Sequence, residues 1–177
     1  RKAKETGLNT ISTYIPWSWH ETNEGQFDFT GKTNPQRDLV SFIKMVNDAG
    51  LFLMARIGPI SNSEIKGEGT PLWFLEKYQD GRAKNQKGGN ALHEAMVSYM
   101  NPVFQQYVSK WYAKICPIVQ KNMLQKGGPI ITVQLDNEIG MMNWVMSSPD
   151  YNEATTKMYQ KYLEEIYKGD ISAVNEK

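Results

Sequence analysis

GGPIITVQLDNEIG, residues 127–140, is the stretch that best indicates how this chain folds. Its Gly-Gly-Pro segment ends one element, and residues 130–135 form a short run of β-branched and apolar residues that predicts a buried strand. Three polar residues, Asp136, Asn137 and Glu138, follow this strand. In parallel α/β barrels the catalytic residues lie at the carboxyl ends of the strands. The stretch therefore predicts a site as well as a strand.

A carboxylic acid at the rim of a buried strand, preceded by an amide, suits the cleavage of a glycosidic bond. Glu138, kept protonated by a partly buried setting, would donate its proton to the leaving oxygen. Asn137 would donate a hydrogen bond to a sugar hydroxyl. The same residues are also typical of a solvated turn after a strand, and the motif alone does not decide between the two interpretations.

Two further segments, residues 8–15 and 51–57, have the composition of strands. Helical patterns follow the three predicted strands, at residues 34–50, 101–119 and 148–169. This alternation, without a hairpin signal between the strands, predicts a parallel α/β architecture. Polar and aromatic residues gather at the carboxyl end of each strand, which favours a (β/α)8 TIM barrel over a doubly wound sheet.

The chain has 177 residues, of which 40% are hydrophobic, enough for one domain with a real core. A complete (β/α)8 barrel typically needs about 250 residues and eight strands. The chain is therefore predicted to be a partial barrel, roughly strands two to four with their helices. We expect residues 1–177 to be the N-terminal part of a catalytic barrel domain, with the first strand and the later strands outside it.

Charge and composition narrow the classes of partner. The net charge is +1 and the basic residues are scattered, so nothing predicts binding to nucleic acid or to an anionic membrane surface. No apolar run approaches the roughly 20 residues that span a bilayer. His20 and His93 lack the spacing of metal ligands, so no zinc site is expected. The single cysteine, Cys116, is predicted to be a packed thiol.

An aromatic cluster, residues 14–21, ends the first predicted strand. Tyr14 and Trp17 belong to it, and such rings offer the apolar faces and polar edges with which proteins hold sugars. The tryptophans are equally typical of a hydrophobic core. Trp144, which follows Glu138 in the sequence, is a further candidate for stacking on a sugar.

Arg56 stands at the end of the second predicted strand, where an arginine is costly unless a carboxylate or a hydrogen-bond network meets it. It is either a structural ion-pair partner or an electrostatic anchor for a catalytic carboxylate. Residues 58–90 are predicted to be long and irregular, apart from an apolar patch at residues 71–75. Residues 61–64, which include Glu64, follow the strand closely enough to enter a site at the strand ends, whereas residues 80–90 are predicted to be solvated.

These segments, in the order in which they follow one another along the chain, resemble glycoside hydrolase family 35, the retaining β-galactosidases. The resemblance covers most of residues 7–144. Its segments are residues 7–11, 13–17, 20–21, 25–29, 37–40, 42–43, 49–51, 56–59, 64, 71–73 and 127–140.

The resemblance implies a retaining hydrolase that cleaves terminal β-D-galactosyl residues of a β-galactoside or oligosaccharide, without a metal or another cofactor. It implies that Glu138 is the general acid/base with Asn137 beside it, and that Tyr14 and Glu64 bind the galactosyl unit. The nucleophile would come from a later strand, outside this chain. Retaining chemistry needs two carboxyl groups about 5 to 5.5 Å apart, so this chain alone is expected to be inactive.

The chain departs from that family's pattern at several positions. Ile57, Ile60 and Ile65 stand where the family usually has proline, tyrosine and an aromatic residue. Leu-Asp at residues 135–136 stands where the family usually has Val-Glu. The departures near Glu64 bear on substrate specificity.

Other interpretations remain open. The run at residues 135–138 and the tail at residues 169–175 resemble the family 42 β-galactosidases, which belong to the same clan of retaining (β/α)8 glycosidases. A noncatalytic carbohydrate-binding barrel fragment would also fit a chain that lacks a second catalytic carboxylate. The sequence has no Asn-x-Ser/Thr sequon, which favours a bacterial or archaeal cytoplasmic protein over a glycosylated secreted one. It predicts no oligomeric state.

Overall fold

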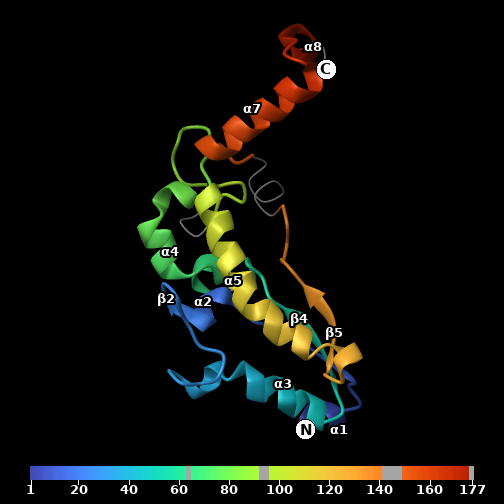
Figure 1. Cartoon of the computed structure of the whole chain (residues 1–177). Helices are drawn as coiled ribbons and strands as arrows, with labels where there is room; N and C mark the ends of the chain where they lie inside the picture. The colour runs from blue at the N-terminus through green and yellow to red at the C-terminus, as the bar shows by residue number, and fades with distance from the viewer. Residues whose placement is uncertain (63–64, 92–95, 141–148, 176–177) are drawn as a thin grey trace. The chain divides into compact units, whose positions relative to one another are not determined.

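The computed structural model describes residues 1–62, 65–91, 96–140 and 149–175. The chain forms two compact units (Figure 1). The first contains residues 1–77 and 108–139, and the second contains residues 78–107 and 140–177. Helix α5 (Pro102–Lys121) contributes residues to both units.

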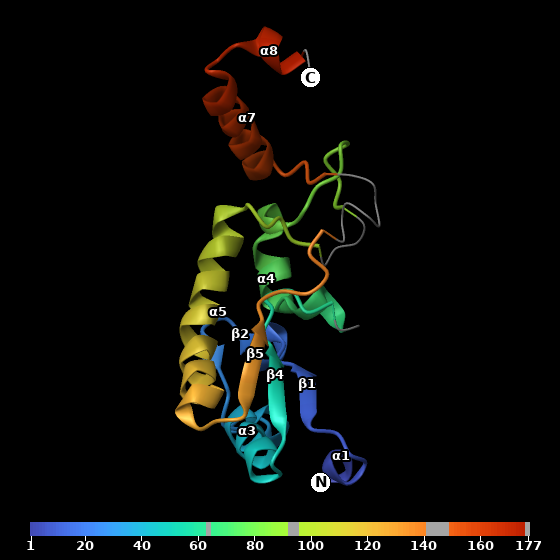
Figure 2. The same cartoon turned by 90° about the vertical axis from the view of Figure 1, so that its right-hand side faces the viewer.

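Three parallel strands form the sheet of the first unit (Figure 2). They are β1 (Thr10–Tyr14), β4 (Phe52–Arg56) and β5 (Ile130–Gln134), in the order β1-β4-β5. Each lies within a segment that the sequence predicted to be a strand. The prediction of an α/β chain with a parallel sheet is confirmed, because both neighbouring pairs are parallel.

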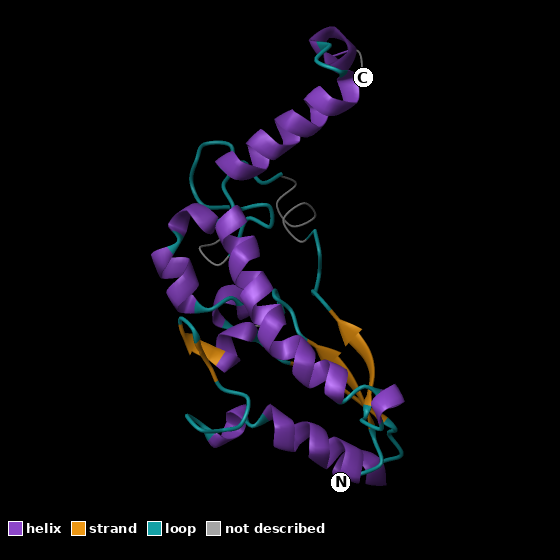
Figure 3. Cartoon of the chain, in the orientation of Figure 1, coloured by secondary structure: helices purple, strands orange, loops and turns teal. Residues whose placement is uncertain are grey.

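Helices separate these strands along the chain, as Figure 3 shows. Those of the first unit are α1 (Lys2–Glu5), α2 (Trp17–His20), α3 (Leu39–Asp48), α4 (Leu72–Lys77) and the part of α5 from Val108 onward. The first unit also contains the short 3-10 helices η1 (Pro35–Arg37), η2 (Lys66–Gly69) and η4 (Leu124–Lys126). The prediction that residues 58–90 are irregular is wrong at η2, whereas α4 forms mostly on the apolar patch that was set apart from the irregular segment.

The buried face of the sheet is set by alternation along β4. Leu53 and Ala55 are fully buried, whereas Phe52 is 42% exposed. Since successive side chains of a strand point to opposite faces, Arg56 lies on the face opposite to Ala55. The core contains buried residues of α3 and α5, namely Ile43, Val46, Trp111, Ile115 and Val119.

The helix predicted to start at Asn34 is divided in two. Asn34 Oδ1 accepts a hydrogen bond from the backbone N–H of Gln36 (2.9 Å) and caps η1. Asp38 then leaves helical geometry, and its Oδ1 accepts from the backbone N–H of Ser41 (2.9 Å). Asp38 is therefore the N-cap of α3, because its short carboxylate satisfies a backbone donor that the helix leaves unpaired.

Sequence analysis missed a hairpin between α2 and α3. Strands β2 (Glu21–Asn23) and β3 (Gln26–Phe27) pair antiparallel. Gly25 adopts φ +79°, which suits glycine in a tight turn. The buried carboxylate of Glu21 accepts the Gly25 backbone N–H at 2.7 Å. The Glu-Gly pair at residues 24–25 was the available signal for this turn.

A buried carboxylate organises the loop after this hairpin. Asp28 accepts hydrogen bonds from the backbone N–H groups of Thr30 (3.0 Å), Lys32 (3.2 Å) and Thr33 (2.7 Å). It also accepts from the Thr33 hydroxyl, at 2.6 Å. These bonds, led by those from Thr33, hold the pKa of Asp28 well below its usual range.

A pH-dependent loss of stability is expected on replacing Asp28 by Asn. Because the pKa is lower in the folded state, the charged Asp28 stabilises the fold above its unfolded pKa, near pH 4, and this contribution is lost as the pH falls further. Urea unfolding of wild type and Asp28→Asn should therefore differ at pH 7 and converge in acid. Asp48→Asn is the control, since exposed Asp48 pairs with exposed Lys44. An equal loss at every pH would contradict the assignment.

The long helical pattern of the sequence is confirmed by α5, but Cys116 is not packed as predicted. Cys116 is exposed, whereas its neighbour Ile115 is fully buried. Adjacent helical residues lie about 100° apart around the axis, so Cys116 falls outside the buried stripe. Within the described ranges, no helix combines the length and apolarity needed to cross a bilayer.

The second unit contains η3 (Gln79–Gly81), the first turns of α5, α7 (Glu153–Tyr167) and α8 (Ile171–Asn175). The prediction that residues 80–90 are solvated is wrong at Arg82 and Ala83, which are buried. Asn152 holds this segment, because its Nδ2 donates to the carbonyls of Asp80 (2.6 Å) and Arg82 (2.9 Å).

Candidate functional site

Tyr14, Arg56 and Gln134 form a row across the carboxyl ends of the three parallel strands. Tyr14 is the register partner of Arg56, and Arg56 is the register partner of Gln134. Paired residues of neighbouring strands project from the same face. The row therefore lies on the face opposite to buried Ala55. The guanidinium carbon of Arg56 lies 3.8 Å from the centroid of the Tyr14 ring, in a cation–π contact.

Arg56 connects the ends of β4 and β5 through its side chain. Its Nε donates to Gln134 Oε1 at 2.7 Å, and its Nη2 donates to Asn137 Oδ1 at 2.6 Å. In the part of the chain that the structure describes, these partners and the Tyr14 ring are neutral groups, and no carboxylate pairs with Arg56. The half-buried guanidinium therefore keeps a positive charge that suits an anionic group at this face.

Asn137 is buried and held from three sides. Its Oδ1 accepts from Gln134 Nε2 at 2.9 Å as well as from Arg56. Its Nδ2 donates to the Ser61 carbonyl at 3.0 Å, and its own carbonyl accepts from Asn62 Nδ2 at 3.0 Å. These bonds join the end of β5 to the segment that follows β4. Asn137 is thereby fixed in position beside Glu138.

Glu138 follows Asn137 directly and is exposed, so the predicted partial burial is not found among the described residues. Its backbone has φ +54°, in the left-handed region that favours glycine. For a residue with a side chain this conformation costs on the order of 1–3 kcal/mol, and such strain is concentrated at active sites. Glu68 and Lys168 have the same backbone conformation, with φ +51° and +52°, so this feature by itself does not separate a catalytic turn from a solvated one.

Trp17 belongs to the core, which decides between the two interpretations of that residue. It is fully buried, and its ring centroid lies 6.3 Å from that of Trp73 and 6.1 Å from that of Phe74. Its indole N–H donates to the Glu21 carboxylate. Trp17 therefore packs in the core beneath the cluster at residues 14–21. Trp19, which is 36% exposed, is the tryptophan of that cluster that solvent can reach.

Two predicted site residues, Glu64 and Trp144, lie outside the described residues. One other, Gln134, was missed by sequence reasoning, whereas Asn62 belongs to residues 61–64, the segment expected to enter the site. Gln134 belongs to the row, and the available signal was a polar residue at the end of an apolar strand. Asn62 contacts Asn137, and its Oδ1 is buried without a hydrogen-bond partner among the described residues.

Helix α5 holds the strand ends from the core side. Trp111 Nε1 donates to the carbonyl of Ile57 at 2.8 Å. The Tyr112 hydroxyl lies 2.8 Å from the carbonyl of Gly58 and 3.1 Å from that of Leu135. Burial raises the pKa of Tyr112 to about 12, so the hydroxyl remains a neutral donor well above neutral pH. One phenol therefore bridges the ends of β4 and β5.

Replacing Tyr112 by Phe is expected to destabilise the protein by about 1–2 kcal/mol, because two carbonyls lose a shared donor while the ring remains. Urea unfolding monitored by circular dichroism measures this. Tyr159→Phe is the matched control, since Tyr159 is 59% exposed on α7, and it should change stability by less than about 0.5 kcal/mol. Equal effects of the two substitutions would contradict the bridging role of Tyr112.

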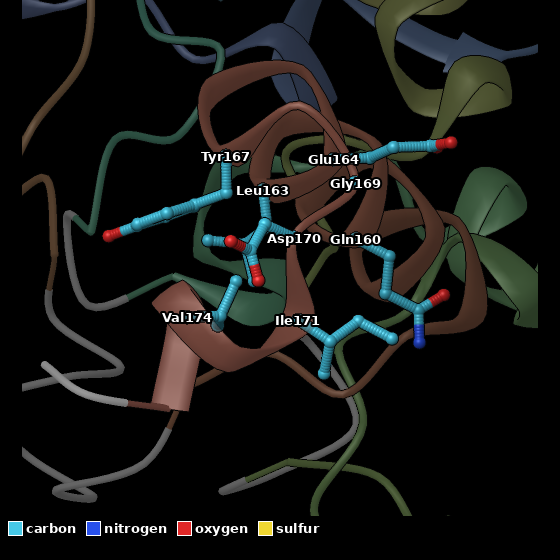
Figure 4. A pocket seen from close by; sticks show the side chains of 8 residues that line it. All are labelled: Gln160, Leu163, Glu164, Tyr167, Gly169, Asp170, Ile171 and Val174. Atoms are coloured by element: carbon cyan, nitrogen blue, oxygen red, sulfur yellow. The ribbon is translucent and has the colours of Figure 1, made fainter.

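Pockets occur in both units. In the first, Tyr14 and Trp19 line a pocket of about 190 Å³, and Trp19 and Glu21 line another of about 580 Å³. In the second unit, Leu163, Tyr167 and their neighbours on α7 and α8 line an apolar pocket of about 380 Å³ (Figure 4). The latter contains none of the predicted site residues. Among the described residues, no cluster of His, Cys, Asp and Glu has the arrangement of a metal site.

Comparison with known proteins gives three informative relatives. A β-1,2-glucosyltransferase of Ignavibacterium album is 40% identical over 93% of this chain and 23% of its own length. An exo-β-D-glucosaminidase of Pyrococcus horikoshii is 36% identical over 97% of this chain and 23% of its own. A mouse β-galactosidase is 35% identical over 78% of this chain and 18% of its own. The chain spans less than a quarter of the length of these curated relatives.

The sequence profile of Glycosyl hydrolases family 35 matches residues 1–175, nearly the whole chain. The match contains β1, β4 and β5, and with them the row of Tyr14, Arg56 and Gln134. Of the two families that the sequence resembles, the comparison supports the first. This chain belongs to Glycosyl hydrolases family 35.

Proposed function

We propose that the whole protein is a retaining glycoside hydrolase that removes terminal β-D-galactosyl residues, with Glu138 as its proton donor. The observation that carries the proposal is the cluster at the carboxyl ends of three adjacent parallel strands. There, Arg56 makes a cation–π contact with Tyr14 and a hydrogen bond with Asn137, the residue immediately before Glu138. In parallel α/β barrels this is the edge of the sheet at which catalytic residues gather.

The proposed reaction is a double displacement. Glu138 protonates the leaving oxygen while a nucleophilic carboxylate from outside this chain attacks the anomeric carbon. Glu138 then removes a proton from the water that releases the sugar. Asn137 donates a hydrogen bond to a sugar hydroxyl, and the positive charge of Arg56 holds the nucleophile ionised. Tyr14 and Glu64 complete the sugar-binding face.

The proposed fold is part of a (β/α)8 barrel. Strands β1, β4 and β5 would be three consecutive strands of it, and the rest of the barrel would pair with the outer edges of β1 and β5. On this proposal residues 1–177 belong to one catalytic domain of the whole protein. The nucleophile lies on a later strand, so this chain alone is inactive.

A second candidate substrate class is the β-glucosides and β-glucosaminides. The relatives with 40% and 36% identity are named for glucosyl transfer and glucosaminide cleavage, whereas the mouse β-galactosidase has 35%. The three isoleucines that depart from the family pattern are not equivalent. Ile57 and Ile60 are 1% and 5% exposed and belong to the core, but Ile65 is 38% exposed. Of these three isoleucines, Ile65, next to Glu64, is thus the one most open to a substrate.

The test is hydrolysis of nitrophenyl β-galactoside by the whole protein, beside the β-glucoside and the β-glucosaminide. The proposal expects the galactoside to have the highest kcat/KM. A higher kcat/KM for the β-glucoside or the β-glucosaminide would contradict the galactosidase proposal and support the second substrate class. Binding of sugars without turnover of any glycoside would instead support a noncatalytic carbohydrate-binding protein.

A further inference from the structure

The side-chain amide of Asn137 has a donor end and an acceptor end of nearly the same shape. Its orientation is decided by the groups around it. Arg56 first fixes the orientation of the Gln134 amide, because a guanidinium only donates hydrogen bonds. Its Nε faces Gln134 at 2.7 Å, so the atom of Gln134 on that side must be the oxygen. The NH2 group of Gln134 is then turned toward Asn137.

Two donors consequently face the same end of Asn137. Gln134 Nε2 lies 2.9 Å and Arg56 Nη2 lies 2.6 Å from that end, which must therefore be the oxygen. The NH2 group is turned the other way, where it donates one hydrogen to the carbonyl of Ser61 at 3.0 Å. An amide NH2 carries two hydrogens, so the second is available to an acceptor such as a sugar hydroxyl.

We propose that Gln134 is a positioning residue that fixes the amide orientation of Asn137, so that Asn137 presents a donor to the substrate. The inference rests on the proposed function. It assigns a role to the side chain that pairs in register with Arg56 on the neighbouring strand. Gln134 is half-buried at the last position of β5, three residues before Asn137. It does not itself contact the reacting atoms in this assignment.

Two substitutions of Gln134 separate orientation from simple support. Gln134→Glu keeps an acceptor for Arg56 but places a second acceptor against Asn137 Oδ1, which favours the flipped amide. Gln134→Met loses both hydrogen bonds but leaves Arg56 to hold Asn137 in its original orientation. We expect kcat/KM of the whole enzyme to fall about 100-fold in the Glu variant and about 10-fold in the Met variant.

A purely structural role gives the opposite order. The Met variant leaves the Arg56 Nε donor without its partner, so it should be the less stable of the two in urea unfolding. A merely structural Gln134 would make the Met variant the less active one as well. Activity and stability that rank the two variants in opposite orders therefore support positioning, and the same order in both measurements overturns it.

The Glu variant also adds a negative charge beside Arg56, so the path through Asn137 needs its own test. If Gln134 acts through Asn137, adding Gln134→Glu to Asn137→Ala should lower kcat/KM by less than about 3-fold further. A full 100-fold loss in the Asn137→Ala background would place the effect on Arg56 and overturn the proposal. Gln120→Glu, at an exposed position of α5, is the charge control and should leave kcat/KM unchanged.

Failure of this inference is distinct from failure of the proposed function. A wild-type enzyme that hydrolyses a glycoside, with Gln134→Glu within about 3-fold of it, overturns the positioning role alone. A whole protein that hydrolyses none of the three nitrophenyl glycosides overturns both. The expected result is that kcat/KM equals that of wild type in Gln120→Glu, is lower in Gln134→Met, and is lowest in Gln134→Glu.

Discussion

Glu138→Gln in the whole protein is expected to lower kcat by about 10²–10⁴-fold on glycosides with poor leaving groups, because an amide cannot supply the proton that the departing oxygen needs. The loss should be smaller when the leaving group is a dinitrophenolate, which departs without protonation. Steady-state rates over a series of aryl glycosides measure this difference. Rates that match wild type across the series would remove Glu138 from the mechanism.

The backbone of Glu138 supplies an independent prediction for the same residue. Glu138→Gly should also lose activity, yet it should raise stability by about 1 kcal/mol, because glycine adopts φ +54° without strain. Glu153→Gln is the matched control for loss of a glutamate, since Glu153 is exposed in the first turn of α7 and pairs with Lys157. Its activity should equal that of wild type. A destabilised Glu138→Gly would show that the turn is not strained.

Trp111→Ala is expected to destabilise the protein by about 3–5 kcal/mol, the cost of emptying a fully buried aromatic site. Trp111 packs against Phe29, with ring centroids 5.8 Å apart, and His20, at 6.4 Å, and it holds the carbonyl of Ile57. The loss should therefore combine a cavity with an unpaired carbonyl. Urea unfolding of the whole protein, followed by circular dichroism, measures it.

Two further tryptophan variants divide that loss into its causes. Trp111→Phe keeps most of the apolar ring and removes the N–H donor to Ile57, so it should cost about 1–3 kcal/mol. Trp19→Ala is the control, because Trp19 is 36% exposed and its N–H lies 3.4 Å from the Gln36 carbonyl. It should cost less than either change at Trp111. If Trp19→Ala destabilised as much as Trp111→Ala, the core would not depend on Trp111.

The strands were predictable because each is a local pattern. Residues 130–135 carry a β-branched run bounded by Gly-Gly-Pro and a polar turn, and β5 forms within them. Helix α5 was predictable for the same reason, since its apolar stripe repeats at helical spacing. The hairpin at Glu21–Phe27 was missed because strands of two and three residues are too short to show an alternation.

The candidate site was predictable only in part. Glu138 and Asn137 follow a recognisable strand, so their place at its carboxyl end came from the sequence, and the family resemblance added Tyr14. The burial of Trp17 was not predictable, because aromatic residues serve cores and sugar sites alike. Gln134 was overlooked because its role depends on Arg56, which lies 78 residues away in the chain.

By itself, the sequence determined the parallel α/β order of the chain, its family, and the Asn-Glu pair after β5, because these depend on neighbouring residues and their spacing. Only the tertiary structure decided that Arg56 meets neutral partners and that Asn137 is locked among Gln134, Ser61 and Arg56. The reason is physical: hydrogen-bond partners and burial are set by groups that folding brings together from distant positions, and no local pattern specifies them.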